Sequence, residues 1–124
     1  MNKTIFDFPM FRQARLISQL SEFDQRYKVG AVISRNNQPL AFGHNKLKTH
    51  AKFPNAFSIH AEMAVLMRNP KTEKATIWVY RETANKVPAI SMPCKLCLPL
   101  IVESGIKRVY YSQPEYPYYG VIEL

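Results

Sequence analysis

The spacing of apolar residues predicts a helix near the start of the chain. From residue 9 to residue 27, apolar side chains recur every three or four positions: Met10, Ala14, Ile17, Leu20, Phe23 and Tyr27. A helix turns once in about 3.6 residues, so this spacing gathers them into one stripe that can face a core. Pro9 suits the first turn of a helix, where an amide hydrogen is not needed. We therefore expect a helix over residues 9–27.

The pattern then changes to runs that are typical of strands. Residues 29–34 and 39–44 are rich in β-forming side chains, and the turn between them contains Asn36 and Asn37, so they predict a hairpin. Residues 60–69 predict a second helix, which ends before Pro70, and residues 93–104 predict a third, which ends before Gly105. Further strands are expected at residues 75–81, 106–112 and 118–124.

This order of elements predicts an α/β fold with a mixed five-stranded sheet covered by three helices. Strand–helix–strand units favour parallel pairing with right-handed crossovers, whereas the first hairpin favours antiparallel pairing. Only twelve residues, 113–124, follow Ser112, and a parallel return needs a crossover of about that length before its strand begins. The last two strands are therefore expected to be antiparallel, unless the final strand is absent. The 124 residues fit a single domain, 1–124.

Charge and composition narrow the classes of partner. The formal charge is +8 and the pI is about 9.7, which suits nucleotides or nucleic acid, although an ordinary basic surface explains the charge equally well. No apolar run approaches the roughly 20 residues of a membrane span, and the first ten residues do not resemble a signal peptide. We expect a cytoplasmic protein with no membrane association, in which Cys94 and Cys97 stay reduced unless they hold a metal.

The two cysteines suggest a metal site. Cys94 and Cys97 stand three residues apart at the start of the third predicted helix, so both sulfurs share a face near the positive end of the helix dipole, which favours thiolate. His60 begins another predicted helix and is the best third donor for zinc. Three protein ligands leave one position for water, as in catalytic zinc sites. A redox cysteine pair and a closed structural zinc site that includes His50 remain as alternatives.

Glu62 adds a candidate proton-transfer group to the three candidate zinc ligands. It lies two residues after His60, in the first turn of the predicted helix, and can point into the same pocket. A carboxylate beside a zinc-bound water can take its proton and pass it to a leaving group. The two residues then divide the work, with His60 binding metal and Glu62 moving protons.

The segments "HAE" at residues 60–62 and "PCKLC" at residues 93–97 resemble the signature of the zinc-dependent cytidine and deoxycytidylate deaminase superfamily. The segments "VGAVI", "AFGHN" and "GIKRVYY" are similar to strands of the same superfamily, so the likeness spans roughly residues 28–112. It implies a three-layer cytidine-deaminase-like fold with Zn²⁺ as cofactor. It also implies zinc ligation by His60, Cys94 and Cys97, and proton transfer by Glu62.

Four further residues are candidates for substrate binding. The resemblance implies that Asn45 contacts the sugar and that the backbone of Ala61 lies against the polar edge of the base. Phe57 can stack on a base, or can pack within its loop. His44 can face the pocket, or can simply end its strand.

We therefore expect an enzyme of nucleotide metabolism, a hydrolase that deaminates a cytosine nucleoside or nucleotide of the cytidine or dCMP type. Deamination of cytosine or adenine in single-stranded DNA, RNA or tRNA is an alternative, which the basic charge supports. A catalytically silent deaminase-like interaction module is another. Within the superfamily, antiparallel final strands are typical of free-nucleoside enzymes, whereas "HAE" and Asn45 are typical of the nucleotide and nucleic-acid branches. Members of the superfamily are often dimers or tetramers, so the resemblance is also compatible with a homo-oligomer.

Overall fold

The structure is a computed structural model that describes residues 4–21, 23, 25–46, 60–68 and 71–124. The helices are α1 (Pro9–Ser18), α2 (Ala61–Leu66) and α3 (Cys97–Glu103), with short 3-10 turns η1 (Ile5–Asp7) and η2 (Gln25–Tyr27). The strands are β1 (Val29–Arg35), β2 (Gln38–His44), β3 (Thr76–Glu82), β4 (Pro88–Ala89), β5 (Arg108–Ser112) and β6 (Tyr119–Glu123). No described helix is long and apolar enough to cross a membrane.

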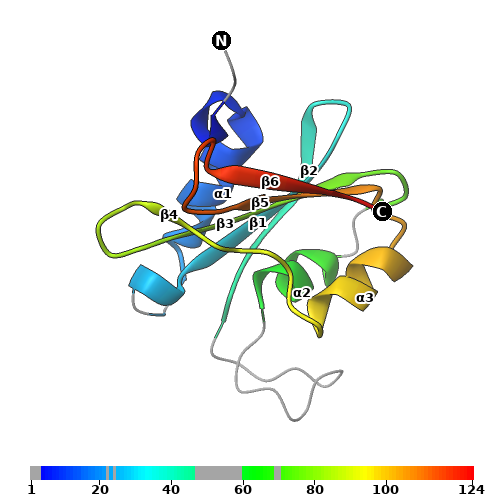
Figure 1. Cartoon of the computed structure of the whole chain (residues 1–124). Helices are drawn as coiled ribbons and strands as arrows, with labels where there is room; N and C mark the ends of the chain where they lie inside the picture. Colours follow the sequence, from blue (N-terminus) through cyan, green and yellow to red (C-terminus); the bar gives the residue numbers. More distant parts are fainter. Residues whose placement is uncertain (1–3, 22, 24, 47–59, 69–70) are drawn as a thin grey trace.

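The strands form one mixed sheet in the order β2-β1-β3-β5-β6, with β4 paired to β3 (Figure 1). The pair β3–β5 is parallel, and the pairs β1–β2, β1–β3 and β5–β6 are antiparallel. The expected mixed sheet with antiparallel final strands is therefore confirmed. The strand β4 was not expected, because residues 82–92 have the composition of a loop. It forms because a turn at Thr83 folds the chain back, so that Ala89 pairs with Arg81.

The sheet is the middle layer of three (Figure 1). One face packs against α1 through a cluster that includes Phe11, Val32 and Trp78. The other face packs against α2 and α3 through a cluster that includes Ile77 and Ile101. Neighbouring residues of a strand point to opposite faces, which is why Ile77 and Trp78 belong to different clusters. The three-layer fold expected from the resemblance is confirmed.

Helix α1 is shorter than its apolar stripe predicts, since it ends at Ser18 rather than near Tyr27. The stripe continues to Leu20 and Tyr27, but these side chains are 63% and 49% exposed and do not hold the helix to the core. The Ser18 hydroxyl donates to the Arg15 carbonyl at 2.6 Å, a local side-chain bond of the kind that competes with helical pairing. The chain then turns into η2 and enters β1.

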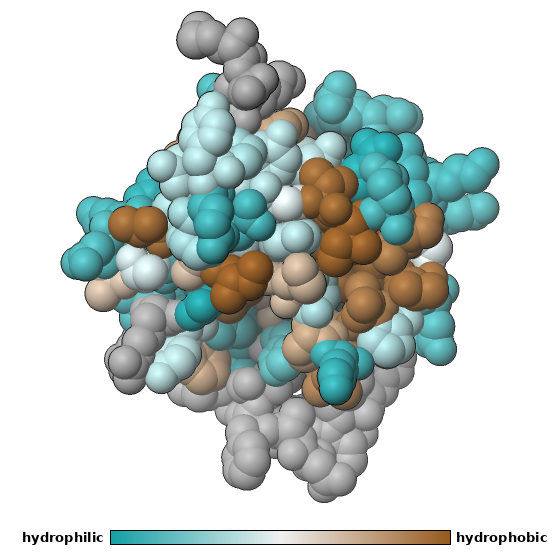
Figure 2. Space-filling model, in the orientation of Figure 1, coloured by the Kyte–Doolittle hydropathy of each residue, from teal (hydrophilic) through white to brown (hydrophobic). Residues whose placement is uncertain are grey.

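Several exposed apolar side chains lie together on the face of the molecule that Figure 2 shows. In Figure 2 this apolar surface lies over β6 and α3. Val102 of α3 is 53% exposed, and Val121 and Leu124, in and after β6, are 40% and 46% exposed. Such a face is compatible with the expected homo-oligomer, which stays a prediction.

Candidate metal centre

Three side chains from different parts of the chain meet at one point. Within the described residues, His60, Cys94 and Cys97 form a cluster whose potential ligand atoms all lie within 4.8 Å of one another. The distance from His60 Nδ1 to Cys97 Sγ is 3.2 Å, and that from the same nitrogen to Cys94 Sγ is 3.6 Å. Zinc bonded tetrahedrally to sulfur at about 2.3 Å and to nitrogen at about 2.0–2.1 Å separates these atoms by about 3.5 Å. The donor set therefore fits zinc in both chemistry and spacing.

Each donor is placed by the start of a helix. His60 directly precedes α2, and its carbonyl accepts from the amide of Ala64 at 2.9 Å, the first bond of that helix. The carbonyl of Cys94 accepts from the amides of Cys97 at 3.2 Å and Leu98 at 3.0 Å. This turn brings the two sulfurs together, although α3 begins at Cys97 and not at residue 93 as expected.

Burial and neighbouring negative charges act on the Cys97 thiol against the effect expected from the helix dipole. Burial raises the pKa of the Cys97 thiol, and the negative charges of Glu62 and Cys94 raise it further. A bound divalent cation has the opposite effect, because it stabilises the deprotonated sulfur. The thiols and the metal are thus coupled, and zinc binding releases their protons.

Glu62 lies in the first turn of α2 and is only 6% exposed. Burial raises its pKa to about 7. A carboxyl group with such a pKa can both take up and release a proton near neutral pH, which is the property of a general acid–base catalyst. Glu62 follows His60 by two residues, so it shares the start of α2 with one of the three donors.

The contact between β2 and α2 holds Glu62 and His60 in place. Gly43 of β2 lies directly against the helix backbone, since a Cβ at this position would stand 2.6 Å from the amide nitrogen of Val65 and 3.0 Å from the carbonyl of Ala61. Only glycine permits this approach without displacement. The helix that carries the site therefore rests on the strand that ends at His44.

The structure also shows where the expected substrate residues lie. Asn45 is 8% exposed; its Oδ1 accepts from the Val29 amide at 3.0 Å, and its Nδ2 donates to the Tyr27 carbonyl at 2.6 Å. His44 Nδ1 lies 3.1 Å from the Asn45 carbonyl oxygen. Ala61 is fully buried, between His60 and Glu62. Phe57 and the alternative zinc donor His50 lie outside the described residues.

Two serines that the sequence analysis did not single out fasten the segment before Cys94. Ser91 Oγ donates to the Val79 carbonyl at 2.8 Å and accepts from the Ser112 amide at 2.8 Å. Ser112 Oγ donates to the Ala89 carbonyl at 2.7 Å. These bonds tie the approach to Cys94 onto β3 and β5. A serine just before the cysteine motif was the available signal, but serines are common in loops.

Comparisons with known proteins agree with this site. The model of the cytidine and deoxycytidylate deaminase zinc-binding region matches residues 7–113. The apo dCMP deaminase of cyanophage S-TIM5 is 28% identical, covers 86% of this chain and 81% of its own, and has a TM-score of 0.62. The structure of the same enzyme in complex with dCMP and dUMP is 26% identical, covers 91% of this chain and 84% of its own, and has a TM-score of 0.66.

A cytidine deaminase from Burkholderia pseudomallei shares the fold, with 19% identity, coverage of 92% of this chain and 89% of its own, and a TM-score of 0.66. The comparison with curated proteins gives no significant match. The family match spans nearly the whole described core and includes the donor cluster and Glu62. The chain therefore belongs to the family defined by the cytidine and deoxycytidylate deaminase zinc-binding region, and it is a hydrolytic deaminase with zinc as its cofactor.

Proposed function

We propose that this deaminase acts on a cytosine mononucleotide of the dCMP type, with His60, Cys94 and Cys97 as zinc ligands and Glu62 as the proton carrier. The observation that carries the proposal is the cluster of His60, Cys94 and Cys97, together with the buried carboxyl group of Glu62 in the first turn of the helix that His60 precedes. The choice of substrate is supported by the similarity to a phage dCMP deaminase in complex with dCMP and dUMP. These two nucleotides differ by the exchange of an amine for an oxygen.

The reaction requires one water molecule and releases ammonia, and the chain supplies the proton transfers. When bound, zinc polarises a water molecule so that it loses a proton near neutral pH. Glu62 accepts that proton and then delivers it to the departing exocyclic amine, so the carboxyl group ends in the state in which it began. The water oxygen forms a bond to the carbon that carried the amine, and the C–N bond breaks. The second proton of the water passes to the adjacent ring nitrogen, so this carbon becomes a carbonyl. Burial of Glu62 matches its pKa to both transfers.

The remaining contacts orient the nucleotide. The side-chain amide of Asn45 accepts one hydrogen bond from the Val29 backbone and donates one to the Tyr27 backbone. It retains a second N–H and a second lone pair, which can bind a sugar hydroxyl. The backbone of Ala61 lies between a metal donor and the proton carrier, where the polar edge of the base must reach. His44 precedes Asn45 and lines the same end of β2, while Phe57 stays a proposed stacking residue. Such a reaction belongs to nucleotide metabolism.

The test is a mass-spectrometric screen of the zinc-loaded protein against dCMP, CMP, deoxycytidine, cytidine, the adenine counterparts, and short single-stranded DNA and RNA. Conversion of dCMP or CMP to the uracil product supports the proposal, and a Glu62→Gln variant with bound zinc is expected to lose it. Conversion of the oligonucleotides alone would assign the chain to nucleic acid instead. Full activity of Glu62→Gln would overturn the assigned proton carrier, and no conversion of any substrate would favour a silent module.

A further inference from the structure

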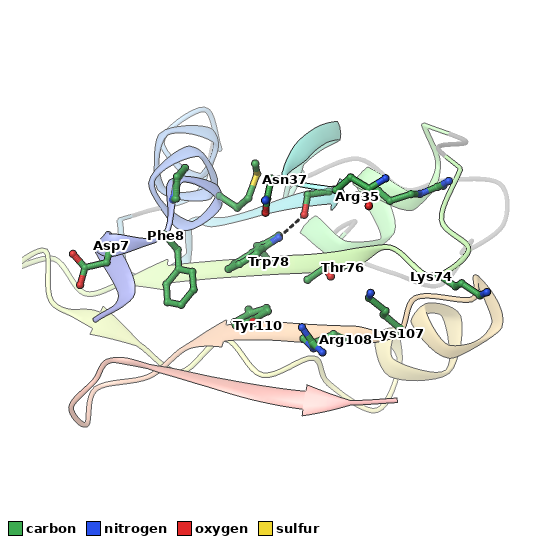
Figure 3. Close-up of a pocket in the computed structure, with 14 residues that line it drawn as sticks. Asp7, Phe8, Arg35, Asn37, Lys74, Thr76, Trp78, Lys107, Arg108 and Tyr110 are labelled. Atoms are coloured by element: carbon green, nitrogen blue, oxygen red, sulfur yellow. Dashed lines mark hydrogen bonds between the residues drawn. The ribbon is translucent and has the colours of Figure 1, made fainter. Parts of the chain in front are cut away.

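A basic hollow that the deaminase reaction does not use lies on the α1 side of the sheet. It has a volume of about 850 Å³, within the range of pockets that take small-molecule ligands. We call it the basic hollow and define it by Phe8, Arg35, Lys74, Trp78, Lys107 and Tyr110, which lie along its wall (Figure 3). Its volume and its charged and aromatic lining are those of a site that could bind a small ligand.

The basic hollow is separate from the zinc site. Its strand residues are the last of β1 and the first of β3 and β5, and the register places Ser34 beside Thr76 and Thr76 beside Arg108. Asn45 is bonded instead to Val29, which pairs with Arg81 at the other end of β3. Thr76 and Arg81 are about 17 Å apart along an extended strand. Trp78 and Tyr110 also belong to the α1 face, whereas α2 and α3 cover the opposite face.

One end of the basic hollow is cationic. Figure 3 shows Arg35, Lys107 and Arg108 near Thr76, with Lys74 further out at the edge of the basic hollow; these four residues come from three different segments of the chain. Arg108 is paired with Glu123 at 2.7 Å. Arg35 donates from Nη2 to the Lys71 carbonyl, while its buried Nε has no hydrogen-bond partner among the described residues.

The other end is aromatic. The rings of Trp78 and Tyr110 stack with centroids 4.0 Å apart and planes 9° apart, and Phe8 packs against both at 5.5 and 5.6 Å. Asp7 also lines this end, where its carboxylate accepts from the Thr4 amide at 2.8 Å. The basic hollow thus offers cations on one side and an aromatic wall on the other. A ligand that matches both has an anionic end and a planar end.

We propose that the basic hollow binds a nucleotide unit, with its phosphates against Lys74 and Lys107 and its base against the aromatic end. Charged donors bind phosphate oxygens strongly, and a base can pack against the ring edges that line the basic hollow, since Trp78 and Tyr110 stack face to face with each other. The nucleotide can be free or can be part of a single strand, since both carry the same chemistry. This site is independent of the substrate proposed for the zinc centre.

Trp78 makes the proposal directly testable, because it is the only tryptophan of the chain and its side chain lines the basic hollow. Its fluorescence is followed while inosine triphosphate is added to the zinc-loaded protein. Inosine has no exocyclic amine, so the probe is not turned over. Inorganic triphosphate tests the phosphate contacts alone, and an oligothymidylate tests the strand. A Lys74→Gln/Lys107→Gln double variant removes two cations, and Lys28→Gln is the control, since Lys28 lies outside the basic hollow.

We expect a saturable change of Trp78 emission with inosine triphosphate, binding about tenfold or more weaker in the double variant, and no change in Lys28→Gln. Inosine triphosphate should bind more tightly than inorganic triphosphate, because the base meets the aromatic end. Tighter binding of the oligothymidylate, with a steep dependence on salt, identifies a strand as the source, and weaker binding identifies a free nucleotide. No saturable change, or equal binding by the double variant or by inorganic triphosphate, would overturn the proposal. Because binding is measured without turnover, this result is independent of the proposed function.

Discussion

Gly43 links the fold to the chemistry, and Gly43→Ala is the substitution that tests this link. The added Cβ would stand 2.6 Å from the Val65 amide nitrogen and 2.9 Å from the Val65 Cα, both backbone atoms of α2. Ordinary contact begins at 3.4 Å, so α2 must move by about 0.8 Å relative to β2. Neither strand backbone nor helix backbone can yield as a flexible side chain does. Overpacking of this kind costs about 1–3 kcal/mol of unfolding free energy.

The same displacement reaches the metal centre, because α2 carries His60 and Glu62 while the cysteines belong to a different segment. A zinc site tolerates deviations of about 0.2 Å in its ligand distances, well below the shift that Gly43→Ala requires. Weaker zinc binding and a loss of turnover on the order of 100-fold are expected, since a misplacement of about 1 Å has that effect on catalysis.

The assay measures urea denaturation, zinc content and turnover of the folded protein. Gly30→Ala is a matched control, because its Cβ would collide with the backbone of α1, 2.1 Å from the Ala14 carbonyl oxygen, and α1 carries no metal donor. It should destabilise the fold at least as much, because its overlap is larger, but with a smaller loss of turnover per folded molecule. The reasoning is refuted if Gly43→Ala leaves stability, zinc content and turnover unchanged, or if the two variants lose turnover equally at equal stability.

Three further predictions concern the site and its support. Glu62→Gln should keep zinc and lose about 10²–10⁴-fold in turnover, measured beside its zinc content, and loss of the metal would show instead that Glu62 holds the site together. Cys97→Ser should release zinc and lower the melting temperature, and a chelator should do the same to the unchanged protein, because metal binding stabilises only the folded state. A melting temperature that does not depend on zinc would contradict the coupling of metal binding to folding. Glu82→Ala should lower the free energy of unfolding, measured by urea denaturation, by about 2–4 kcal/mol. The reason is that the buried Glu82 carboxylate accepts hydrogen bonds from Arg15 at 2.8 Å, Tyr80 at 2.6 Å and Gln25 at 3.2 Å. A decrease below about 0.5 kcal/mol would mean that these bonds make no net contribution to stability.

Expectations that depend on local sequence agree well with the structure. The hairpin around Asn36 and Asn37 forms, and both residues adopt positive φ angles of 53° and 62°, as their tolerance of the left-handed region predicts. Gly105 ends α3 with a φ of 82°. The last two strands are antiparallel, which was one of the two outcomes left open by the sequence, the other being an absent final strand. Each of these outcomes is decided within a few residues, so neighbouring side chains suffice to predict it.

Expectations that depend on burial agree less well. The apolar stripe predicted a helix as far as Tyr27, yet the structure ends α1 at Ser18, because periodicity does not reveal which apolar residues meet a core. The strand β4 was missed for a related reason. It has two residues and pairs with Arg81 and Glu82, where β3 continues past the end of its pairing with β5 at Val79. An edge is a property of the assembled sheet, and no short stretch of sequence carries it.

The sequence by itself indicated the donor types and their order, and it suggested Glu62 as the proton carrier, because "HAE" and "PCKLC" each lie within about one helical turn. Only the tertiary structure brought His60 to 3.2 Å from Cys97 across 37 positions, buried Glu62 deeply enough to raise its pKa, and set the ends of β1, β3 and β5 side by side to form the basic hollow. These are long-range effects. They depend on strand register and on helix-to-sheet packing, where a side chain's neighbours are distant in sequence, and the free energy of burial decides them.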